Sequence, residues 1–229
     1  MNLRFRLGQA YDRLRAGDIR HLLHLVRNRI HSDTLRVGIR KQPTDADEAR
    51  SATADNPVRI ASMADIEAVR DPGRGGATDP NELWQRRFRR HVAETVGPGR
   101  CYVADCGDLG PSFMQFLFFP EDNDLVQAKF PDIGPPVQPG EAMVEYLYVA
   151  PDARSLPFVI NCLVHVAAEA RRRDATSIIT YAPIGNKAAL LSTRLAGYQP
   201  FAIRRLKYRL FRRHVSYEPY TENMSNEGR

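Results

Sequence analysis

One strand-to-helix turn of the chain holds residues that could do chemistry. Residues 149–163 read VAPDARSLPFVINCL, which is the end of an apolar strand, a short polar turn and the start of a helix. Free N–H groups at a helix N-terminus bind anions such as phosphate, and Arg154 and Ser155 would add a charge and a hydroxyl there. Glycines that let a phosphate approach are absent, and Pro157 has no N–H. The turn therefore predicts a stable helix with a weakened anion site.

A carboxylate precedes this turn. Glu145 lies four residues before Val149 in the segment EAMVEYLYV (141–149), so strand alternation predicts that both side chains share one face. Apolar neighbours disfavour a charged carboxylate and raise its pKa toward the range in which it can accept a proton from an amine. Glu145 is the candidate general base, and its alternative role is to pair with one of the chain's many arginines.

The surrounding elements alternate between strands and helices. Their apolar patterns give the order β-α-α-β-β-β-α-β-α-β-β from residue 58 onward. The proline-rich segment 121–140 is expected to be a long loop, either a lid or a surface excursion. The expected strands are 58–62, 100–106, 111–119, 141–149, 176–183 and one or two across 198–211, and the expected helices are 63–71, 82–96, about 156–170 and 186–197.

The formal net charge of +6 is unevenly distributed. Residues 1–41 hold ten Lys/Arg and three Asp, and residues 200–214 hold six Lys/Arg and no acidic residue, so the remainder is net acidic. Basic ends attract anionic partners such as lipid head groups, an acidic carrier protein or RNA; the alternative is a solvated basic face. Nucleic acid is the least favoured partner, because these ends carry no recognised RNA-binding motif.

The chain is expected to have four parts. Residues 1–41 form a basic arm in which Asp18 can cap an amphipathic helix, and such a helix either packs on its own domain or lies on a membrane. Residues 42–57 are polar and are predicted to be a linker. Residues 58–214 form the folded domain, and residues 215–229 form a polar tail.

Composition disfavours several classes of protein. No apolar run approaches the ~18 residues of a membrane span, and the N-terminus lacks the apolar centre of a signal peptide. We therefore expect a cytoplasmic protein, with peripheral contact to the inner face of the membrane through the basic arm as an option. Cys101, Cys106 and Cys162 form no CxxC pair and predict reduced, mostly buried thiols, with neither a disulfide framework nor a metal site.

The order of elements carries a family resemblance. Together with VAPDAR (149–154) before one helix, and Asn186 and Gly197 around the next, it resembles the GNAT superfamily of acyl-CoA-dependent N-acyltransferases over residues 58–213. The resemblance implies an α/β fold with a mixed, twisted sheet of about six to seven strands and flanking helices, to which the basic helical arm is added. It also implies that the strands at 141–149 and 176–182 run parallel and splay apart.

The resemblance also assigns the turn. In GNAT proteins it reads R/Q-x-x-G-x-G/A, and its amides hold the pyrophosphate of coenzyme A. Arg154 matches this pattern, whereas Pro157 and Val159 replace its glycines. The donor-binding residues implied by the resemblance are Tyr146, Leu147, Val149, Arg154, Ser155, Leu156, Phe158, Val159 and Asn186.

The catalytic assignments follow from the same resemblance. Glu145 corresponds to the water-mediated base that accepts a proton from the acceptor amine. Thr193 occupies the position of the tyrosine that protonates the departing thiolate in many members, and a threonine hydroxyl is a much weaker acid. The alternatives are water, a neighbouring tyrosine such as Tyr148 or Tyr181, or no acid at all, and each tyrosine is otherwise a packing residue.

Three functions follow as hypotheses. The first is an N-acyltransferase that moves an acetyl or longer acyl group from acetyl-CoA or another acyl-CoA to a small or larger amine by direct attack, without a metal. The second takes its acyl group from an acyl carrier protein, whose single phosphate suits the weakened turn and whose acidity suits the basic ends. The third is a binding module that keeps the fold without catalysis.

Overall fold

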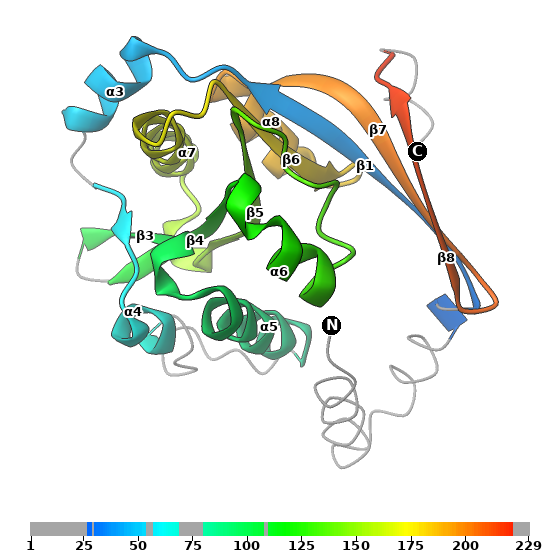
Figure 1. Ribbon diagram of the computed structural model, residues 1–229. Coiled ribbons are helices and arrows are strands. Elements are labelled where there is room, and N and C mark those ends of the chain that lie inside the picture. Colours follow the sequence, from blue (N-terminus) through cyan, green and yellow to red (C-terminus); the bar gives the residue numbers. More distant parts are fainter. Residues whose placement is uncertain (1–26, 29, 54–56, 69–79, 108–109, 222–229) are drawn as a thin grey trace.

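Eight strands form one mixed sheet within the residues that the computed structural model describes, which are 27–28, 30–53, 57–68, 80–107 and 110–221. The strand order is β2-β3-β4-β5-β6-β1-β7-β8 (Figure 1). β5 and β6 run parallel, and the other neighbouring pairs run antiparallel. The predicted mixed sheet is confirmed, with eight strands in place of six to seven. The strands are β1 (His31–Lys41), β2 (Arg59–Ile60), β3 (Cys101–Asp105), β4 (Pro111–Phe118), β5 (Glu141–Val149), β6 (Ser177–Pro183), β7 (Gln199–Arg209) and β8 (Arg212–Pro219).

Helices cover both faces of the sheet (Figure 1). One face carries α7 (Leu156–Arg172) and α8 (Lys187–Leu195), with α3 (Asp45–Ala52) packed against α7. The other face carries α4 (Met63–Ala68), α5 (Pro80–Val96) and α6 (Asn123–Lys129). We refer to these as the α7 face and the α5 face. α6 lies in the segment 121–140, which was predicted to be a loop; a single buried residue, Val126, gives it too short an apolar pattern to detect.

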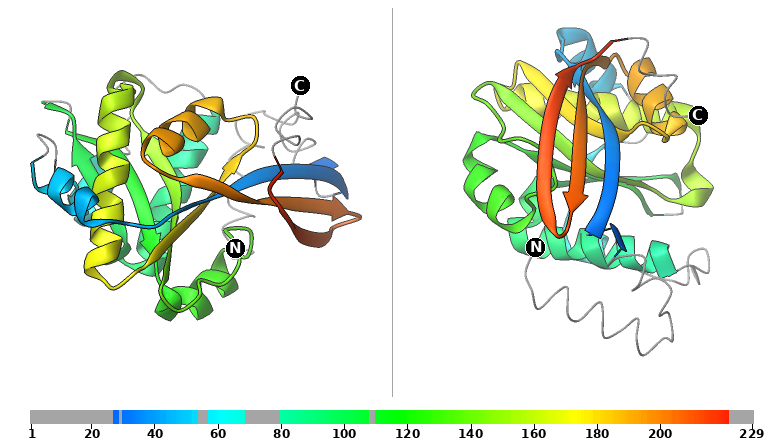
Figure 2. Two further views of the ribbon diagram at one scale, coloured as in Figure 1. Left: turned by 90° about the horizontal axis from the view of Figure 1, so that it is seen from above. Right: turned by 90° about the vertical axis from the view of Figure 1, so that its right-hand side faces the viewer.

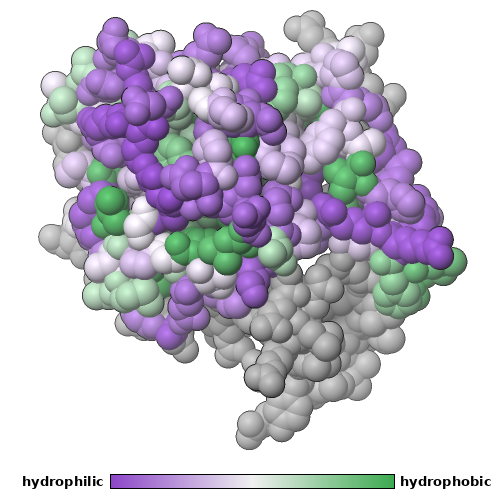
Figure 3. Space-filling model, viewed as in Figure 1, coloured by the Kyte–Doolittle hydropathy of each residue, from purple (hydrophilic) through white to green (hydrophobic). Residues whose placement is uncertain are grey.

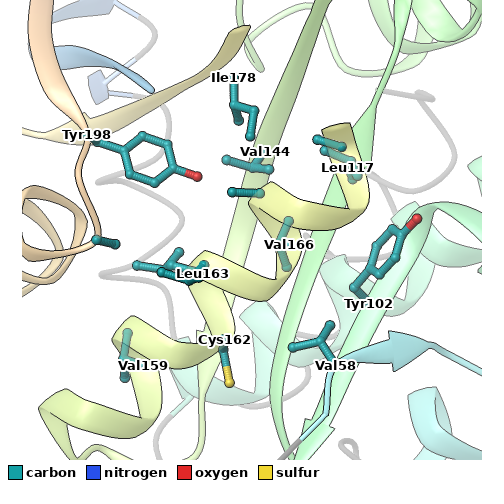
Figure 4. Close-up of a cluster of buried hydrophobic side chains, with 14 of the residues drawn as sticks. Val58, Tyr102, Leu117, Val144, Val159, Cys162, Leu163, Val166, Ile178 and Tyr198 are labelled. Carbon is teal, nitrogen blue, oxygen red and sulfur yellow. The ribbon is translucent and has the colours of Figure 1, made fainter. Parts of the chain in front are cut away.

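The α7 face buries the larger apolar cluster, part of which Figure 4 shows. α7 forms because apolar residues recur every three or four positions, and Pro157 fits in its first turn. Its inner side chains face those of β5 and β6, so the start of α7 is fixed relative to these two strands. The clustered side chains include Val159, Cys162, Leu163 and Val166 of α7, Val144 of β5 and Ile178 of β6. Cys101, Cys106 and Cys162 are free thiols, and burial raises the pKa of Cys162 to about 12.

Residues 31–41 belong to the sheet and not to a separate arm. They form β1, which lies between β6 and β7 and is antiparallel to both. The prediction was wrong here because the charge of the segment hid an alternation: Val37 and Ile39 face the α7 cluster, while Arg36 and Arg40 are the intervening residues. The amphipathic helix predicted from Asp18 lies almost entirely outside the described residues.

Two other predicted boundaries also shift. The predicted linker 42–57 contains α3, whose first turn is fixed by Asp47, because its carboxylate accepts a hydrogen bond from Thr44 N–H at 2.9 Å. At the other end, β8 extends to Pro219 and so includes the start of the predicted tail at 215–229. The tail residues 222–229 lie outside the described residues. The polar residues 215–219 have no apolar core of their own, and their backbone is ordered by hydrogen bonds to the neighbouring strand β7.

A buried ion pair ties β1 to both helical neighbours. Lys41 Nζ lies 2.7 Å from Asp47 Oδ1 of α3 and donates to the carbonyl of Ala196, at the end of α8, at 2.6 Å. Lys41 and Asp47 are 7% and 8% exposed. The ammonium therefore joins three elements that are distant in the sequence.

Replacing Lys41 with Met should lower the free energy of unfolding by about 3 to 5 kcal/mol, because Asp47 is left buried without its cation. Chemical denaturation measures this. The matched control is Glu94→Gln, which removes an exposed helical ion pair with Arg90 and should change stability by less than about 1 kcal/mol. Equal effects of the two substitutions would show that the Lys41 pair is not a structural link.

Candidate functional site

The site centres on the place where β5 and β6 separate. The two strands pair at Glu141 with Ser177, Ala142 with Ile178 and Met143 with Ile179, and the described register ends there. Beyond these pairs the strands diverge, which confirms the predicted splay. We call the diverging ends, residues 144–149 and 180–183, the splay. Its backbone groups are not paired between the two strands, so those without another partner can bond to an extended ligand.

A bulge in β5 adjoins the splay. Met114 of β4 pairs with Tyr148, and Phe116 pairs with Glu145, so β5 has one extra residue opposite β4. Tyr146 lies in this extra stretch and takes a left-handed φ of 58°, which is uncommon for a side chain of its size. Strained backbone of this kind concentrates at functional sites.

The bulge reverses the alternation of β5, so one prediction is wrong. Before the bulge, Val144 packs in the α7 cluster and Met143 in the α5 cluster; after it, Val149 packs against the α7 cluster and Tyr148 in the α5 cluster. Glu145 follows Met143 in alternation on the α5 face, so Glu145 and Val149 lie on opposite faces. Alternation across the segment could not show this, because an extra residue leaves no pattern in a strand that is apolar on both faces.

Arg89 of α5 supports the bulge. Its Nε donates to the carbonyl of Tyr146 at 3.4 Å, one of its terminal nitrogens donates to the carbonyl of Leu147 at 3.3 Å, and its guanidinium lies 4.8 Å from the Tyr148 ring centre. Phe88 and Phe116 pack edge-on against the Tyr146 ring. Sequence reasoning missed Arg89, because it lies in the basic run RRFRR (86–90), which resembles a solvated surface.

Glu145 lies in the splay itself. It is 6% exposed, and its Oε1 accepts a hydrogen bond from Tyr181 N–H at 3.0 Å, a donor that the diverging strands leave free. Burial raises the pKa of Glu145 to about 7, against the weaker opposing influence of Arg36 and Arg204. A carboxyl with this pKa gains and loses its proton near neutral pH, so it can act as a base there.

Two arginines of the neighbouring strands share this environment. Arg36 of β1 and Arg204 of β7 are paired across the strands, and both affect the charge of Glu145. Arg204 is 1% exposed, and one terminal nitrogen donates to the carbonyls of Asp132 and Ile133 at 2.9 and 3.2 Å. Both arginines act on Glu145 by charge, and no ion pair joins Glu145 to an arginine among the described residues, so its two predicted roles, base and partner of an arginine, stay predictions. Neither arginine could be assigned to the site from the sequence, because the place of β1 in the sheet was not predicted.

The start of α7 keeps part of an anion site. Its first helical turn offers the N–H groups of Leu156 and Phe158, since Pro157 has none and Val159 N–H bonds to the carbonyl of Ser155 at 3.1 Å. The side chains of Phe158 and Val159 lie in the core, so only the backbone of this turn is accessible to an anion.

The side chains before α7 stand apart from its core. Arg154 is exposed, and its Nε donates to the carbonyl of Val149 at 3.2 Å, which holds the guanidinium near the N-terminus of the helix. Ser155 is the N-cap residue but makes no side-chain capping hydrogen bond. Its hydroxyl is therefore free of a capping role and can donate to an anion.

Asn186 and Thr193 have structural partners in α8. The side chain of Asn186 accepts a hydrogen bond from Ala189 N–H at 3.1 Å and so caps the helix. Thr193 is buried, and its hydroxyl lies 2.8 Å from the carbonyl of Ala189, to which it donates. This hydroxyl is engaged by its own helix, so the geometry gives no support to Thr193 as an acid. The predicted alternatives Tyr148 and Tyr181 are also buried, at 7% and 4% exposure.

No helix in the described part of the chain is long and apolar enough to cross a membrane. In the same part, no group of three or more His, Cys, Asp or Glu side chains is arranged to hold a metal ion.

Comparison with known proteins gives matches among solved structures alone. The chain matches no protein-family model and no curated protein. The GCN5-related glucosamine N-acetyltransferase region of a fungal multi-domain GH3 β-N-acetylglucosaminidase is 14% identical with a TM-score of 0.51, and the match covers 77% of this chain and 21% of that one. A protein of unknown function from Staphylococcus epidermidis is 12% identical with a TM-score of 0.50, covering 87% and 67%.

A GNAT-family acetyltransferase from Colwellia psychrerythraea is 13% identical with a TM-score of 0.49, covering 87% of this chain and 62% of that one. This chain thus spans about a fifth of the fungal protein that it matches. At such identities the likeness concerns the fold. The chain therefore has the fold of the GNAT superfamily.

Proposed function

We propose that the protein is an N-acyltransferase that moves an acyl group from a CoA thioester to an amine. The observation that carries this proposal is the position of Glu145, a buried carboxyl with a pKa of about 7 at the point where β5 and β6 diverge. A base of this kind suits an amine acceptor, because the amine nitrogen must lose a proton when it forms a stable bond to an acyl carbon. The glucosamine N-acetyltransferase region named for the fungal neighbour supports the choice of an amine as acceptor.

The chain's residues fit a thioester donor in the splay. Backbone groups of the diverging strands other than Tyr181 N–H and the carbonyls of Tyr146 and Leu147, which have side-chain partners, can pair with the amides of a pantetheine arm, as a sheet edge pairs with an extended peptide. The N–H groups of Leu156 and Phe158, the hydroxyl of Ser155 and the charge of Arg154 would then meet the donor's phosphates. Arg89 fixes the bulge and so keeps these groups in place.

The reaction then needs few protein groups. The carboxylate of Glu145 accepts a proton from the acceptor amine, directly or through a water, and the amine nitrogen attacks the thioester carbon. A C–N bond forms, the C–S bond of the tetrahedral intermediate breaks, and the departing thiolate takes up a proton from water. The product is an amide and a free thiol, with no change of oxidation state.

A carrier-protein donor is the second candidate, and one observation favours it. Pro157 removes one of three N–H groups from the first turn of α7, and a diphosphate requires more donors than the single phosphate of a carrier-linked phosphopantetheine. Donor binding is therefore measured with CoA and with an acyl carrier protein.

Glu145→Gln should lower kcat by about 10²- to 10⁴-fold while donor affinity stays nearly unchanged, because the base acts on the amine. Gln keeps an oxygen that can accept from Tyr181 N–H. A thiol-release assay gives kcat, and calorimetry gives donor affinity. The control is Glu141→Gln, which removes another carboxylate of β5, one paired with Arg40 at the surface, and should leave kcat unchanged. Unaltered turnover in Glu145→Gln would exclude this base.

Stability should depend on pH through the same carboxyl. Its pKa is about 7 in the folded protein against an ordinary 4.5, so folding favours the protonated form. The resulting stabilisation is complete below pH 4.5 and is lost as the pH rises to about 7; it amounts to roughly 3 kcal/mol at most. Denaturation of wild type and Glu145→Gln between pH 5 and about 8 should show a fall in wild type that the variant lacks. Parallel curves would contradict the buried, protonatable state of Glu145.

Arg154→Ala should weaken binding of CoA by roughly one to two orders of magnitude, because a charge-assisted contact to phosphate is lost. Binding of pantetheine, which has no phosphate, should not change. Calorimetry with both ligands and with an acyl carrier protein measures this. Arg172→Ala removes the same charge at the far end of α7 and is the control. If the unaltered protein binds none of these donors, it is a binding module and not an acyltransferase.

A further inference from the structure

The turn between β7 and β8 holds large apolar residues where the backbone disfavours them. Arg209 pairs with Arg212, so Leu210 and Phe211 alone make the turn, and their φ angles are 48° and 66°. Two-residue turns with positive φ at both positions favour Asn and Gly, because larger side chains are strained there. Leu210 and Phe211 are also 76% and 65% exposed, and contact of such large apolar side chains with water is unfavourable as well.

The strands carry this turn to the outside of the molecule. β1, β7 and β8 form a ribbon that extends beyond the helical layers (Figures 1 and 2). Ile30, 40% exposed, lies beside the turn, since its carbonyl accepts a hydrogen bond from Leu210 N–H at 2.8 Å. We call Ile30, Leu210 and Phe211 the hairpin tip. Figure 3 shows apolar surface at the right-hand edge of the molecule, next to strongly hydrophilic surface.

Arginines border the hairpin tip. Arg209 and Arg212 flank the turn, Arg213 follows, and residues 200–214 contain no acidic side chain. Arg212 and Arg213 are exposed. Arg213 forms an ion pair with Asp132, with an N–O distance of 2.7 Å. Arg209 and Arg212, the two cations nearest the turn, have no carboxylate partner among the described ion pairs. The hairpin tip thus combines a small apolar end with positively charged side chains beside it.

We propose that the hairpin tip inserts into the head-group region of an anionic lipid bilayer. The apolar side chains enter the boundary of the acyl chains, and the arginines contact lipid phosphates. A protein partner fits less well, because a stable interface buries about 800 Å² on each side and three side chains at a convex tip supply far less. RNA would engage the arginines and could stack a base on Phe211, but it would leave Leu210 and Ile30 in water. Because the apolar area is small, the contact is peripheral and reversible.

This surface differs from the predicted membrane contact through residues 1–41, since its apolar part comes chiefly from the β7–β8 turn. It is also independent of the proposed acyl transfer, because no residue of the hairpin tip lies in the splay. The two proposals can therefore fail separately.

The test is co-sedimentation of the full chain with vesicles of phosphatidylcholine alone and of phosphatidylcholine with about 30% phosphatidylglycerol. We expect binding to the anionic vesicles only, weakened by salt. The key variant is Leu210→Asn with Phe211→Gly, which suits the turn and removes its apolar side chains. It should reduce partition into anionic vesicles about tenfold or more while the melting temperature does not fall.

Two further variants separate apolar from basic contributions. Arg212→Glu keeps the apolar turn and should also weaken binding to anionic vesicles. Leu191→Gln with Leu195→Gln removes two leucines of α8 that are 50% and 52% exposed and should leave binding unchanged. The proposal is overturned if the wild type binds no vesicles or if the turn variant binds as well as wild type. It is also overturned if the turn variant melts at a lower temperature or changes oligomeric state, because the tip would then be covered by protein.

Discussion

The separation of β5 from β6 is the constraint on which the rest of the site depends. Parallel strands normally share their hydrogen bonds along their length, and here they stop sharing them after Met143 and Ile179. Backbone groups released in a protein interior need other partners. Glu145 supplies one for Tyr181, and Arg89 supplies partners for the carbonyls of Tyr146 and Leu147. The splay is therefore stabilised by side-chain groups that replace the missing strand pairs.

This arrangement gives the two faces of the sheet different characters. The α7 face is filled by aliphatic and aromatic side chains around α7, with the buried Lys41–Asp47 ion pair on the same side, and it fixes where that helix begins. The α5 face holds aromatic rings and buried charges, including Arg89, Glu145 and Arg204. Because desolvation of a charge is unfavourable, buried charged side chains usually have a partner or a function. The α7 face therefore positions the helix, while the α5 face positions the ionisable groups of the splay.

Much of the fold could be predicted from local patterns, whereas the site depended on features that such patterns do not carry. The strand at 141–149, the helix from 156 and the loss of a donor at Pro157 followed from periodicity and from the chemistry of single residues. Glu145 could be chosen because it is a carboxylate among apolar neighbours in this strand and because it matches the base position of the GNAT resemblance. The bulge at Tyr146 could not be predicted, since a strand that is apolar on both faces tolerates an extra residue without a visible break. Arg89 could not be distinguished from its neighbours in a basic run. β1 was missed because its pairing partners are far away in the sequence, and charge counts say nothing about pairing.

The position of β1 has a consequence for how the chain is made. Arg36 pairs with Pro183 on one side and with Arg204 on the other, so β1 leaves the ribosome long before either partner exists. Folding of this half of the sheet is a late, long-range event, which is intrinsically slow because distant segments must meet first. Until then, the sequence LRVGI presents unpaired backbone and apolar side chains to other chains in the cell. During synthesis, this segment is the strand of the described sheet that waits longest for its partners.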